Sequence, residues 1–255
     1  MPSLDGVARR ARLLALVESA GFVRVSDAAA ELGVSEVTAR ADLRDLERDG
    51  MLRRVHGGAV RLAPVRESRV EETAAREADR KRAIGAVAAG LVRSGSSVML
   101  DVGSTTHAVA EALAARDDLT DVVVVTNGVS IALALEPAAS RITVVVTGGI
   151  LRPLQHSLVD TIAVDAVRGL RADLAIIGCT GIAEGRVMNV NLPETAVKRA
   201  MIDASTERVL VADGSKLGRR DLGVVADLAE FGTLVTTGPV DAFVTPPGTR
   251  VVVAA

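Results

Sequence analysis

The first part of the chain has the periodicity of short helices. Between Arg9 and Ala20, apolar residues recur at the i, i+3, i+4, i+7 spacing that is typical of a helix with one buried stripe. Ser26 is expected to cap a second helix that runs through Leu32 and is ended by Gly33. Two short helices separated by a glycine turn are therefore predicted.

A third helix and a hairpin follow in the predicted order. Ser35 can cap a helix over residues 36–48, and residues 51–55 then have the composition of an extended segment. Residues 56–58 favour a turn, and residues 59–62 favour a returning strand. This order predicts an N-terminal winged helix-turn-helix, an α-helical unit with a small β wing.

Farther along, the pattern changes to alternating strands and helices. Strand-like runs occupy residues 98–101, 122–126, 142–147, 174–178 and 209–212. Helical stretches lie at residues 106–115, 128–135, 160–169 and 193–204. Such alternation predicts an α/β domain with a mostly parallel sheet and helices on its faces.

These patterns divide the chain into three parts. Residues 1–62 form the predicted winged helix-turn-helix, and residues 94–255 form the predicted α/β domain. Residues 63–93 are a linker and a connecting helix, which is predicted over residues 67–93 because Arg, Glu and Ala dominate there. The domain boundary is placed near Pro64.

Composition narrows the class of protein. Hydrophobic residues make up 49% of the chain and charged residues 24%, which is typical of a globular protein with a sizeable core. The apolar runs have strand length and the N-terminus lacks the pattern of a signal peptide, so a cytoplasmic location is expected. The single Cys179 excludes an intrachain disulfide, and the three histidines lack metal-binding spacing. No metal or other cofactor is expected.

The net charge of −2 is unevenly divided. Residues 1–82 hold 16 Lys and Arg against 14 Asp and Glu, a balance of +2, whereas the remainder holds 14 against 18, a balance of −4. This division leaves DNA open as a partner, because a DNA-binding site needs only a local basic face. With three Phe and no Trp or Tyr, the chain lacks the stacking surfaces of single-strand and RNA binders. Duplex DNA is the better candidate.

The predicted third helix has two faces. At about 100° per residue, Ala39, Leu43 and Leu46 share a narrow arc that is expected to face the core. The opposite arc holds Val37, Arg40, Ala41, Arg44 and Arg48. Its arginines can reach phosphates or guanine edges. The alternative is a solvated surface, because the helix also carries Asp42, Asp45 and Glu47. The basic cluster at residues 53–56 favours DNA binding.

Three glycine- and hydroxyl-bearing loops follow predicted strands, at residues 101–106, 126–128 and 147–149. The first opens a helix, so its free backbone N–H groups favour a phosphate, although a simple helix cap explains a single such loop equally well. Loops at the carboxyl ends of strands are where an open α/β sheet binds a ligand. Farther along, Glu194 with Lys198 reads as a ligand site or as an i, i+4 pair, and Asp213 with Lys216 as a ligand site or as a turn.

The run from Val34 to Val60, VSEVTARADLRDLERDGMLRRVHGGAV, resembles the DNA-binding segment of the DeoR family of bacterial repressors. The family usually has two adjacent arginines where this chain has Arg40-Ala41. The resemblance implies DNA contacts from the recognition helix and from the wing. The implied residues are Ser35, Thr38, Arg40, Arg44, Arg53, Arg54 and His56.

The stretch from Lys81 to Thr237 is similar to the C-terminal domain of the same family, whose fold is related to ribose-5-phosphate isomerase and which binds phosphorylated sugars. The chain departs from the family at Cys179-Thr180, where an acid is often present, and at Asp160, where glycine is common. With the loops above, the resemblance implies an effector site. Its residues are Gly103, Ser104, Thr105, Thr106, Asn127, Gly148, Gly149, Glu194, Asp213 and Lys216.

We therefore expect a repressor of carbohydrate-metabolism genes that binds operator DNA as a homo-oligomer and is released by a phosphorylated sugar or a related metabolite. One alternative is a sugar-phosphate isomerase fused to a DNA-binding module, with Glu194 or Asp213 as base and Lys216 as electrostatic partner. The DNA-reading elements and the missing acid at Thr180 argue against an enzyme. Another alternative is an α/β module without a ligand, which the three loops disfavour.

Overall fold

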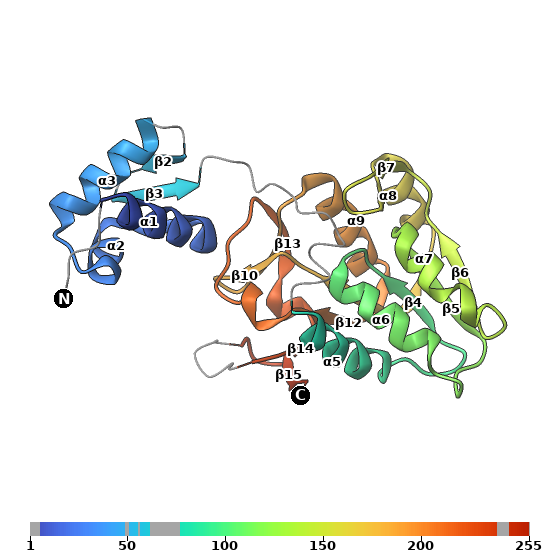
Figure 1. Cartoon of the computed structure of the whole chain (residues 1–255). Helices are drawn as coiled ribbons and strands as arrows, with labels where there is room; N and C mark the ends of the chain where they lie inside the picture. The colour runs from blue at the N-terminus through green and yellow to red at the C-terminus, as the bar shows by residue number, and fades with distance from the viewer. Residues whose placement is uncertain (1–5, 49–50, 56, 62–76, 239–244, 255) are drawn as a thin grey trace. The chain divides into compact units, whose positions relative to one another are not determined.

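The computed structural model describes residues 6–48, 51–55, 57–61, 77–238 and 245–254. The chain divides into two compact units, Met1–Arg66 and Glu67–Ala255, each with its own core (Figure 1). Among the described residues, every helix is too short or too polar to cross a membrane.

The N-terminal unit contains three helices and a small sheet. The helices are α1 (Gly6–Ala20), α2 (Val25–Leu32) and α3 (Glu36–Arg48). The strands β1 (Phe22–Arg24), β2 (Leu52–Val55) and β3 (Gly58–Arg61) form an antiparallel sheet in the order β1-β3-β2. Leu13, Leu43 and Leu52 are fully buried where helices and sheet meet. This arrangement is the predicted winged helix-turn-helix.

The entry into α2 differs from the prediction. Strand β1 pairs with β3 and runs directly into α2, which begins at Val25, so Ser26 lies inside the helix and does not cap it. A three-residue strand is too short to show a period in the sequence. Its pairing needs a glycine at position 58, because a Cβ there would lie 2.3 Å from the Val23 carbonyl oxygen.

The C-terminal unit is built on a seven-stranded parallel sheet of order β15-β14-β12-β9-β4-β5-β6. Its strands are β4 (Ser97–Leu100), β5 (Val122–Thr126), β6 (Ile142–Val146), β9 (Ala172–Gly178), β12 (Ser205–Val211), β14 (Thr233–Thr236) and β15 (Arg250–Val253). The hairpin of β7 (Ile150–Arg152) and β8 (Ser157–Val159) follows β6, and β10 (Gly181–Ala183), β11 (Arg186–Asn189) and β13 (Gly223–Asp227) form an antiparallel sheet. The central sheet confirms the predicted parallel α/β architecture.

Helices cover both faces of the central sheet, as Figure 1 shows. One core contains residues of α5 (Ala78–Ala89), α6 (Ser104–Ala114) and α7 (Val129–Leu135), and the other contains residues of α8 (Thr161–Arg168) and α9 (Leu192–Asp203). Short 3-10 turns lie at Glu136–Ala138, Gly214–Lys216 and Leu228–Glu230. Successive residues of one strand face opposite cores, for example Val98 and Met99.

The connecting helix is shorter than predicted. Helix α5 begins at Ala78, after Glu77 with φ 56°, and ends at Ala89, whereas we predicted a helix over residues 67–93. Residues 67–76 lie outside the described part of the chain. Gly90 follows the helix as its C-cap, which explains why the alanine- and arginine-rich pattern overestimates its length at that end.

Helices α5 and α6 approach each other closely at Gly85. A Cβ at this position would lie 2.5 Å from the Ala108 carbonyl oxygen. We expect Gly85→Ala to lower the free energy of unfolding by about 1 to 2 kcal/mol, because overpacking outweighs the gain in helix propensity. Chemical denaturation followed by circular dichroism measures the change. Gly169→Ala is the matched control, since the nearest atoms to its Cβ lie 3.7 Å away. A stability of Gly85→Ala equal to that of the control would contradict the close approach.

Candidate nucleic-acid interface and effector site

Helix α3 has the predicted division into a buried and an exposed face. Ala39, Leu43 and Leu46 are buried. The opposite face is exposed at Val37, Arg40, Ala41, Arg44 and Arg48. The N-terminus of the helix is capped as expected, because the Thr38 backbone N–H donates to Ser35 Oγ at 3.2 Å. The Ser35 and Thr38 hydroxyls are also hydrogen-bonded to each other, at 2.9 Å.

Arg40 on the exposed face and Arg54 in the wing are paired with carboxylates. Arg40 Nη2 lies 2.9 Å from Glu36 Oε2, one turn earlier on α3. In the wing, the Arg54 backbone N–H donates to Glu47 Oε1 at 2.8 Å, and its guanidinium lies 3.8 Å from the same carboxylate. Exposed pairs of this kind contribute little stability. DNA phosphates can therefore compete for these arginines. The side chain of Arg53 and residue His56 lie outside the described part of the structure.

Asp42 does not belong to the solvated acidic surface with which we grouped it in the sequence. It is 3% exposed and accepts two hydrogen bonds from Arg9, Nε to Oδ2 at 2.6 Å and Nη2 to Oδ1 at 3.0 Å. This bidentate ion pair holds α1 against α3. It positions α3 from its buried side.

The predicted loops of the C-terminal unit lie together at one edge of the sheet, because β4, β5, β6 and β12 run parallel. Helix α6 starts at Ser104, and its N-cap residue Gly103 has φ 148° and provides no side-chain cap. Thr106 is fully buried and its hydroxyl donates to the Gly103 carbonyl at 3.0 Å. The first backbone N–H groups of α6 are thus presented at this edge.

The next two loops hold the β7–β8 hairpin in place. Asn127 is buried, and its Nδ2 donates to the Leu158 carbonyl at 3.1 Å. Gly148 and Gly149 follow β6, both with positive φ. A Cβ on Gly149 would lie 2.4 Å from the Val159 carbonyl oxygen, so this glycine allows the hairpin to approach.

Glu194 and Lys198 do not form the i, i+4 pair that their spacing suggested, because each has a different partner. The buried Glu194 carboxylate accepts from Ser157 Oγ at 2.6 Å, from Asn189 Nδ2 at 3.3 Å and from the Arg152 guanidinium. Glu194 therefore joins the start of α9 to the β7–β8 hairpin and to β11.

Lys198 forms a buried ion pair with Asp101, a residue that we did not assign to the site from the sequence. Both side chains are at most 2% exposed. Asp101 Oδ2 also accepts from the Gly178 backbone N–H at 3.1 Å, and Lys198 Nζ donates to the Gly178 carbonyl at 3.1 Å. Burial raises the pKa of the Asp101 carboxyl, and the nearby Lys198 ammonium opposes this rise. In the sequence, the signal that could have identified Asp101 was its position at the end of a predicted strand.

Asp213 has the local role that its turn position suggested. It is buried, and its Oδ1 accepts from the Ser215 backbone N–H at 3.0 Å and from the Ser215 hydroxyl. Lys216 is half-buried. Burial raises the pKa of the neighbouring Cys179 thiol to about 12, against the opposing charges of Lys198 and Lys216. The thiol therefore stays protonated at neutral pH.

Several buried oxygen atoms at this edge have no hydrogen-bond partner among the described residues. Among the described residues, seven buried side-chain nitrogen and oxygen atoms lack a hydrogen-bond partner, and four of them are oxygens that follow or end sheet strands here: Asp101 Oδ1, Asn127 Oδ1, Thr236 Oγ1 and Thr237 Oγ1. Buried polar atoms are nearly always hydrogen-bonded in folded proteins. Asp101 Oδ1 and Asn127 Oδ1, which follow the adjacent strands β4 and β5, therefore mark a place where a polar ligand can bind.

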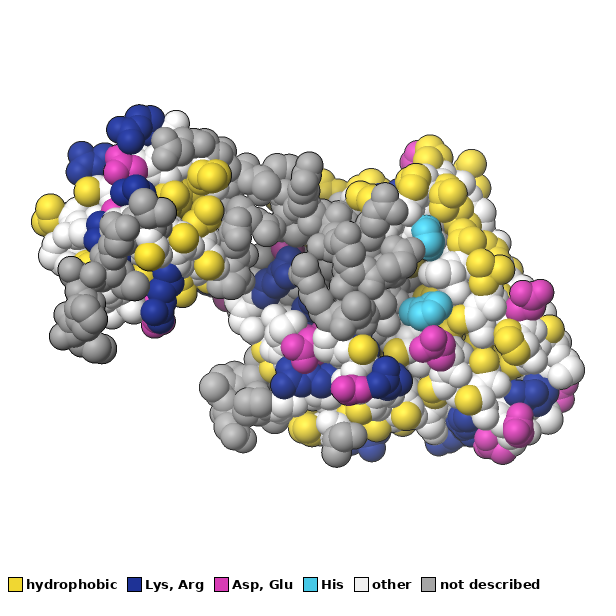
Figure 2. Space-filling view, viewed as in Figure 1, with side chains coloured by type: hydrophobic (Ala, Val, Ile, Leu, Met, Phe, Trp, Pro, Cys, Tyr) yellow, Lys and Arg dark blue, Asp and Glu magenta, His cyan; other side chains and the backbone are white. Residues whose placement is uncertain are grey.

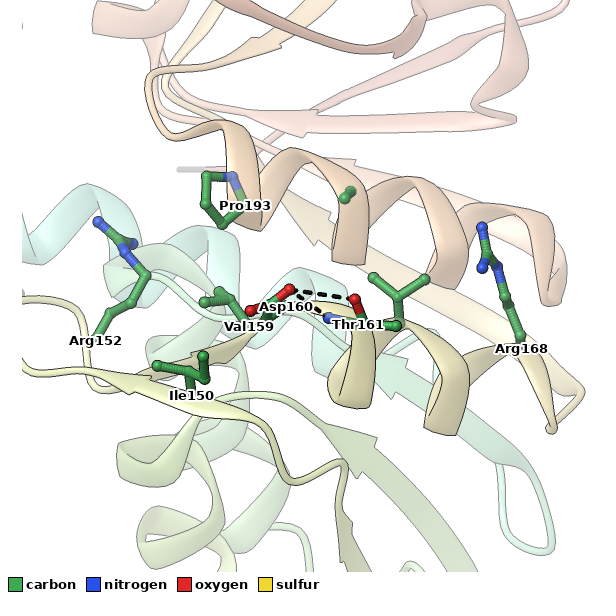
Figure 3. Close-up of a pocket in the computed structure, with 9 residues that line it drawn as sticks. Ile150, Arg152, Val159, Asp160, Thr161, Arg168 and Pro193 are labelled. Atoms are coloured by element: carbon green, nitrogen blue, oxygen red, sulfur yellow. Dashed lines mark hydrogen bonds between the residues drawn. The ribbon is translucent and has the colours of Figure 1, made fainter.

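A separate cavity of about 660 Å³ lies between the β7–β8 hairpin, α8 and α9 (Figure 3). Its lining residues include Ile150, Arg152, Val164, Arg168 and Pro193. Asp160 lies in its wall and caps α8 by accepting from the Thr161 backbone N–H at 2.7 Å. Arg152 lines this cavity and also contacts Glu194, so one side chain connects the cavity with the buried Glu194 carboxylate. The predicted phosphate loop lines no part of it.

A winged helix-turn-helix joined to an α/β domain defines the class of one-chain transcriptional regulators with a sensor domain. The DeoR-like helix-turn-helix domain matches residues 9–65, and the DeoR C terminal sensor domain matches residues 76–238. The chain belongs to the DeoR family, and it is a DNA-binding transcriptional regulator.

Relatives match over nearly the whole chain. The glycerol-3-phosphate regulon repressor of Haemophilus influenzae is 31% identical over 89% of this chain and 88% of that protein. An uncharacterized HTH-type transcriptional regulator of Escherichia coli is 34% identical over 90% of this chain and 89% of its own. Among solved structures, ribose 5-phosphate isomerase A of Methanocaldococcus jannaschii covers 55% of each chain with 18% identity and a TM-score of 0.41. A likeness at this level does not carry an activity from one protein to the other.

The Asp101–Lys198 pair leads to a stability prediction. Lys198→Met removes one partner of a buried ion pair and leaves the Asp101 carboxylate uncompensated, which is expected to cost about 3 to 5 kcal/mol at neutral pH. Adding Asp101→Asn to this variant should restore part of the loss, because the pair then leaves no unpaired buried charge. Chemical denaturation of the two variants and the wild type measures both effects.

The same variant should show a characteristic pH dependence. Without Lys198, the folded-state pKa of Asp101 rises further above its unfolded value, so the folded state holds the extra proton. The variant therefore loses stability as the pH rises from the unfolded-state pKa of Asp101 through its folded-state pKa. The difference in unfolding free energy between the wild type and Lys198→Met should be smaller at pH 5 than at pH 8. A deficit that does not depend on pH would contradict the assignment.

Proposed function

We propose that this regulator represses carbohydrate-metabolism genes and leaves its operator when a phosphorylated sugar binds the C-terminal unit. The observation that carries the proposal is the pair of unpaired buried oxygens, Asp101 Oδ1 and Asn127 Oδ1, which follow the adjacent strands β4 and β5 beside the uncapped start of α6. The name of one relative supports a phosphorylated small molecule as the ligand, since that protein is a glycerol-3-phosphate regulon repressor. A regulator of this kind would act in the cytoplasm.

On the DNA side, we assign contacts to Ser35 and Thr38 at the start of α3 and to Arg40 and Arg44 on its exposed face. Arg53, Arg54 and His56 are assigned to the wing. The exposed ion pair of Arg40 with Glu36 supports this role, because a weakly held guanidinium can exchange its partner for a phosphate or a guanine edge. Two half-sites on a palindromic operator would require at least two copies of the chain.

On the effector side, we assign the phosphate to Gly103–Thr106, where backbone N–H groups and the helix dipole favour an anion. Asp101 Oδ1 and Asn127 Oδ1 can each accept a hydrogen bond from a sugar hydroxyl. Lys216 is assigned to the carbonyl or hydroxyl end of the ligand. Gly148, Gly149, Glu194 and Asp213 would support the site through their structural contacts.

The same contacts favour a sensor over an isomerase. The Glu194 carboxylate accepts hydrogen bonds from three side chains, and Asp213 caps the turn that follows β12. Both candidate bases are therefore held in structural contacts, whereas a general base must reach a substrate proton. We propose that the sensor domain binds its ligand without turnover.

Release from DNA requires the effector to prefer the conformation that binds the operator poorly. A coupling free energy of about 1 to 3 kcal/mol would change DNA affinity roughly 5- to 150-fold. By linkage, operator DNA must weaken effector binding by the same factor. Calorimetric titration of a sugar phosphate with and without operator duplex tests this reciprocity.

Substitutions on α3 should separate the attraction of Arg40 to DNA from the competition of Glu36 for the same guanidinium. Arg40→Ala is expected to weaken operator binding by about 1 to 3 kcal/mol if the guanidinium contacts a base. Glu36→Gln should strengthen binding, because it frees Arg40 and removes a negative charge near the phosphates. Fluorescence anisotropy titrations of a labelled duplex measure both changes. Unchanged affinity in a folded Arg40→Ala variant would remove Arg40 from the interface.

The phosphate site can be tested at Ser104, which is half-buried at the start of α6. Ser104→Asp places a carboxylate where the phosphate is expected, while a helix N-terminus tolerates the charge. This variant should bind operator normally but lose its response to sugar phosphates such as glycerol 3-phosphate and ribose 5-phosphate. Ser104→Asn is the control, because it has the same shape without the charge and should keep more of the response. Equal responses of both variants would place the phosphate elsewhere.

A further inference from the structure

The exposed face of α3 contains an apolar strip as well as arginines. Val37 is 72% exposed, the highest value among the large hydrophobic side chains described in the N-terminal unit. Phe22, Met51 and Val55 are 41%, 52% and 37% exposed. Ala41 lies one helical turn after Val37 and is also exposed. The two residues form a continuous patch of methyl groups, which we call the α3 methyl strip.

The strip lies among the cationic side chains of the same surface. Arg40 and Arg44 are three and seven positions after Val37, so they lie beside the strip on the same face of the helix. Figure 2 shows basic side chains over the N-terminal unit with hydrophobic side chains beside them. A β-branched valine is a weaker helix former than a lysine or glutamate. Solvation of the helix surface therefore does not explain valine at this position.

Charge complementarity decides which partner covers the strip. A methyl patch flanked by arginines matches a surface that offers negative charge and an apolar group together. The major groove of DNA has this combination, since phosphates border it and the 5-methyl group of thymine is the apolar group exposed on its base edges. Val37 has no hydrogen-bonding side-chain atom, so among base-edge groups the thymine methyl is the one that it can recognise.

We infer that Val37, with Ala41 beside it, reads a thymine methyl group in the operator. This inference rests on the proposed role of α3 as the DNA-contacting helix. Residues three apart on a helix face lie about 5 to 6 Å apart, and successive base pairs about 3.4 Å. The thymine should therefore lie within two base pairs of the position that Arg40 contacts.

The experiment uses the full-length protein and duplexes selected with it from a random library. Each thymine of the tightest duplex is replaced, one at a time, by deoxyuridine, which lacks only the methyl group. We expect one or two replacements in each half-site to weaken wild-type binding about fourfold, the effect of burying one methyl group. Val37→Ala should bind the thymine and uracil duplexes equally well. Val55→Ala, a matched truncation in the wing, should keep the difference.

Two outcomes would overturn the inference: wild-type protein that is insensitive to every thymine methyl, or a methyl effect that persists in Val37→Ala. The affinity of Arg40→Ala for the same duplex shows whether the inference about Val37 alone is wrong or whether the proposed DNA interface on α3 is wrong as well. If Arg40→Ala weakens binding while the methyl effect is absent, α3 contacts DNA but Val37 does not read thymine. If neither substitution on α3 changes binding, the proposed interface is wrong together with the inference.

Discussion

The buried ion pair between Asp101 and Lys198 is the contact that organises the edge of the central sheet where its parallel strands end. Asp101 follows β4, Lys198 lies on α9, and both bind the backbone of Gly178 at the end of β9. The pair therefore joins the two adjacent central strands to a helix on one face of the sheet. Because removing water from two charges is costly, such a pair is stable only when further hydrogen bonds satisfy it. The Gly178 N–H and carbonyl provide these bonds.

The pair also explains the contacts of Glu194. Because Lys198 binds Asp101, the Glu194 carboxylate binds Arg152 and Ser157 instead and holds the β7–β8 hairpin. One carboxylate oxygen of Asp101 is satisfied and the other faces no partner among the described residues. A ligand that donates a hydrogen bond at this oxygen would bind directly to the residue that ties the strands to the helix. Effector binding and the packing of α9 would then be coupled through a single side chain.

The N-terminal unit also contains a buried ion pair that fixes a helix. The Arg9–Asp42 pair holds α1 against α3 from the buried side, whereas the pairs of Arg40 and Arg54 lie on the exposed side. A buried bidentate pair fixes a helix, and an exposed pair is weak enough to exchange. The buried pair thus fixes α3 against α1, while the guanidinium of Arg40 stays exposed on the opposite face.

The sequence by itself determined the architecture and the exposed face of α3. Periodicity separates strands from helices when an element spans several repeats, and it correctly separated Leu43 from Arg44 on α3. Short elements such as β1 escaped it, because three residues show no period. The start of α5 at Ala78 and the position of Ser26 inside α2 also departed from local signals.

The tertiary structure alone decided which charged residues pair. The i, i+4 spacing suggested Glu194 with Lys198, and the composition of α3 placed Asp42 on its surface. Folding instead brought Lys198 to Asp101, 97 positions away, and Asp42 to Arg9, 33 positions away. Electrostatic partners are chosen by burial and by the distance between side chains after the helices pack, and neither quantity is written in the local sequence.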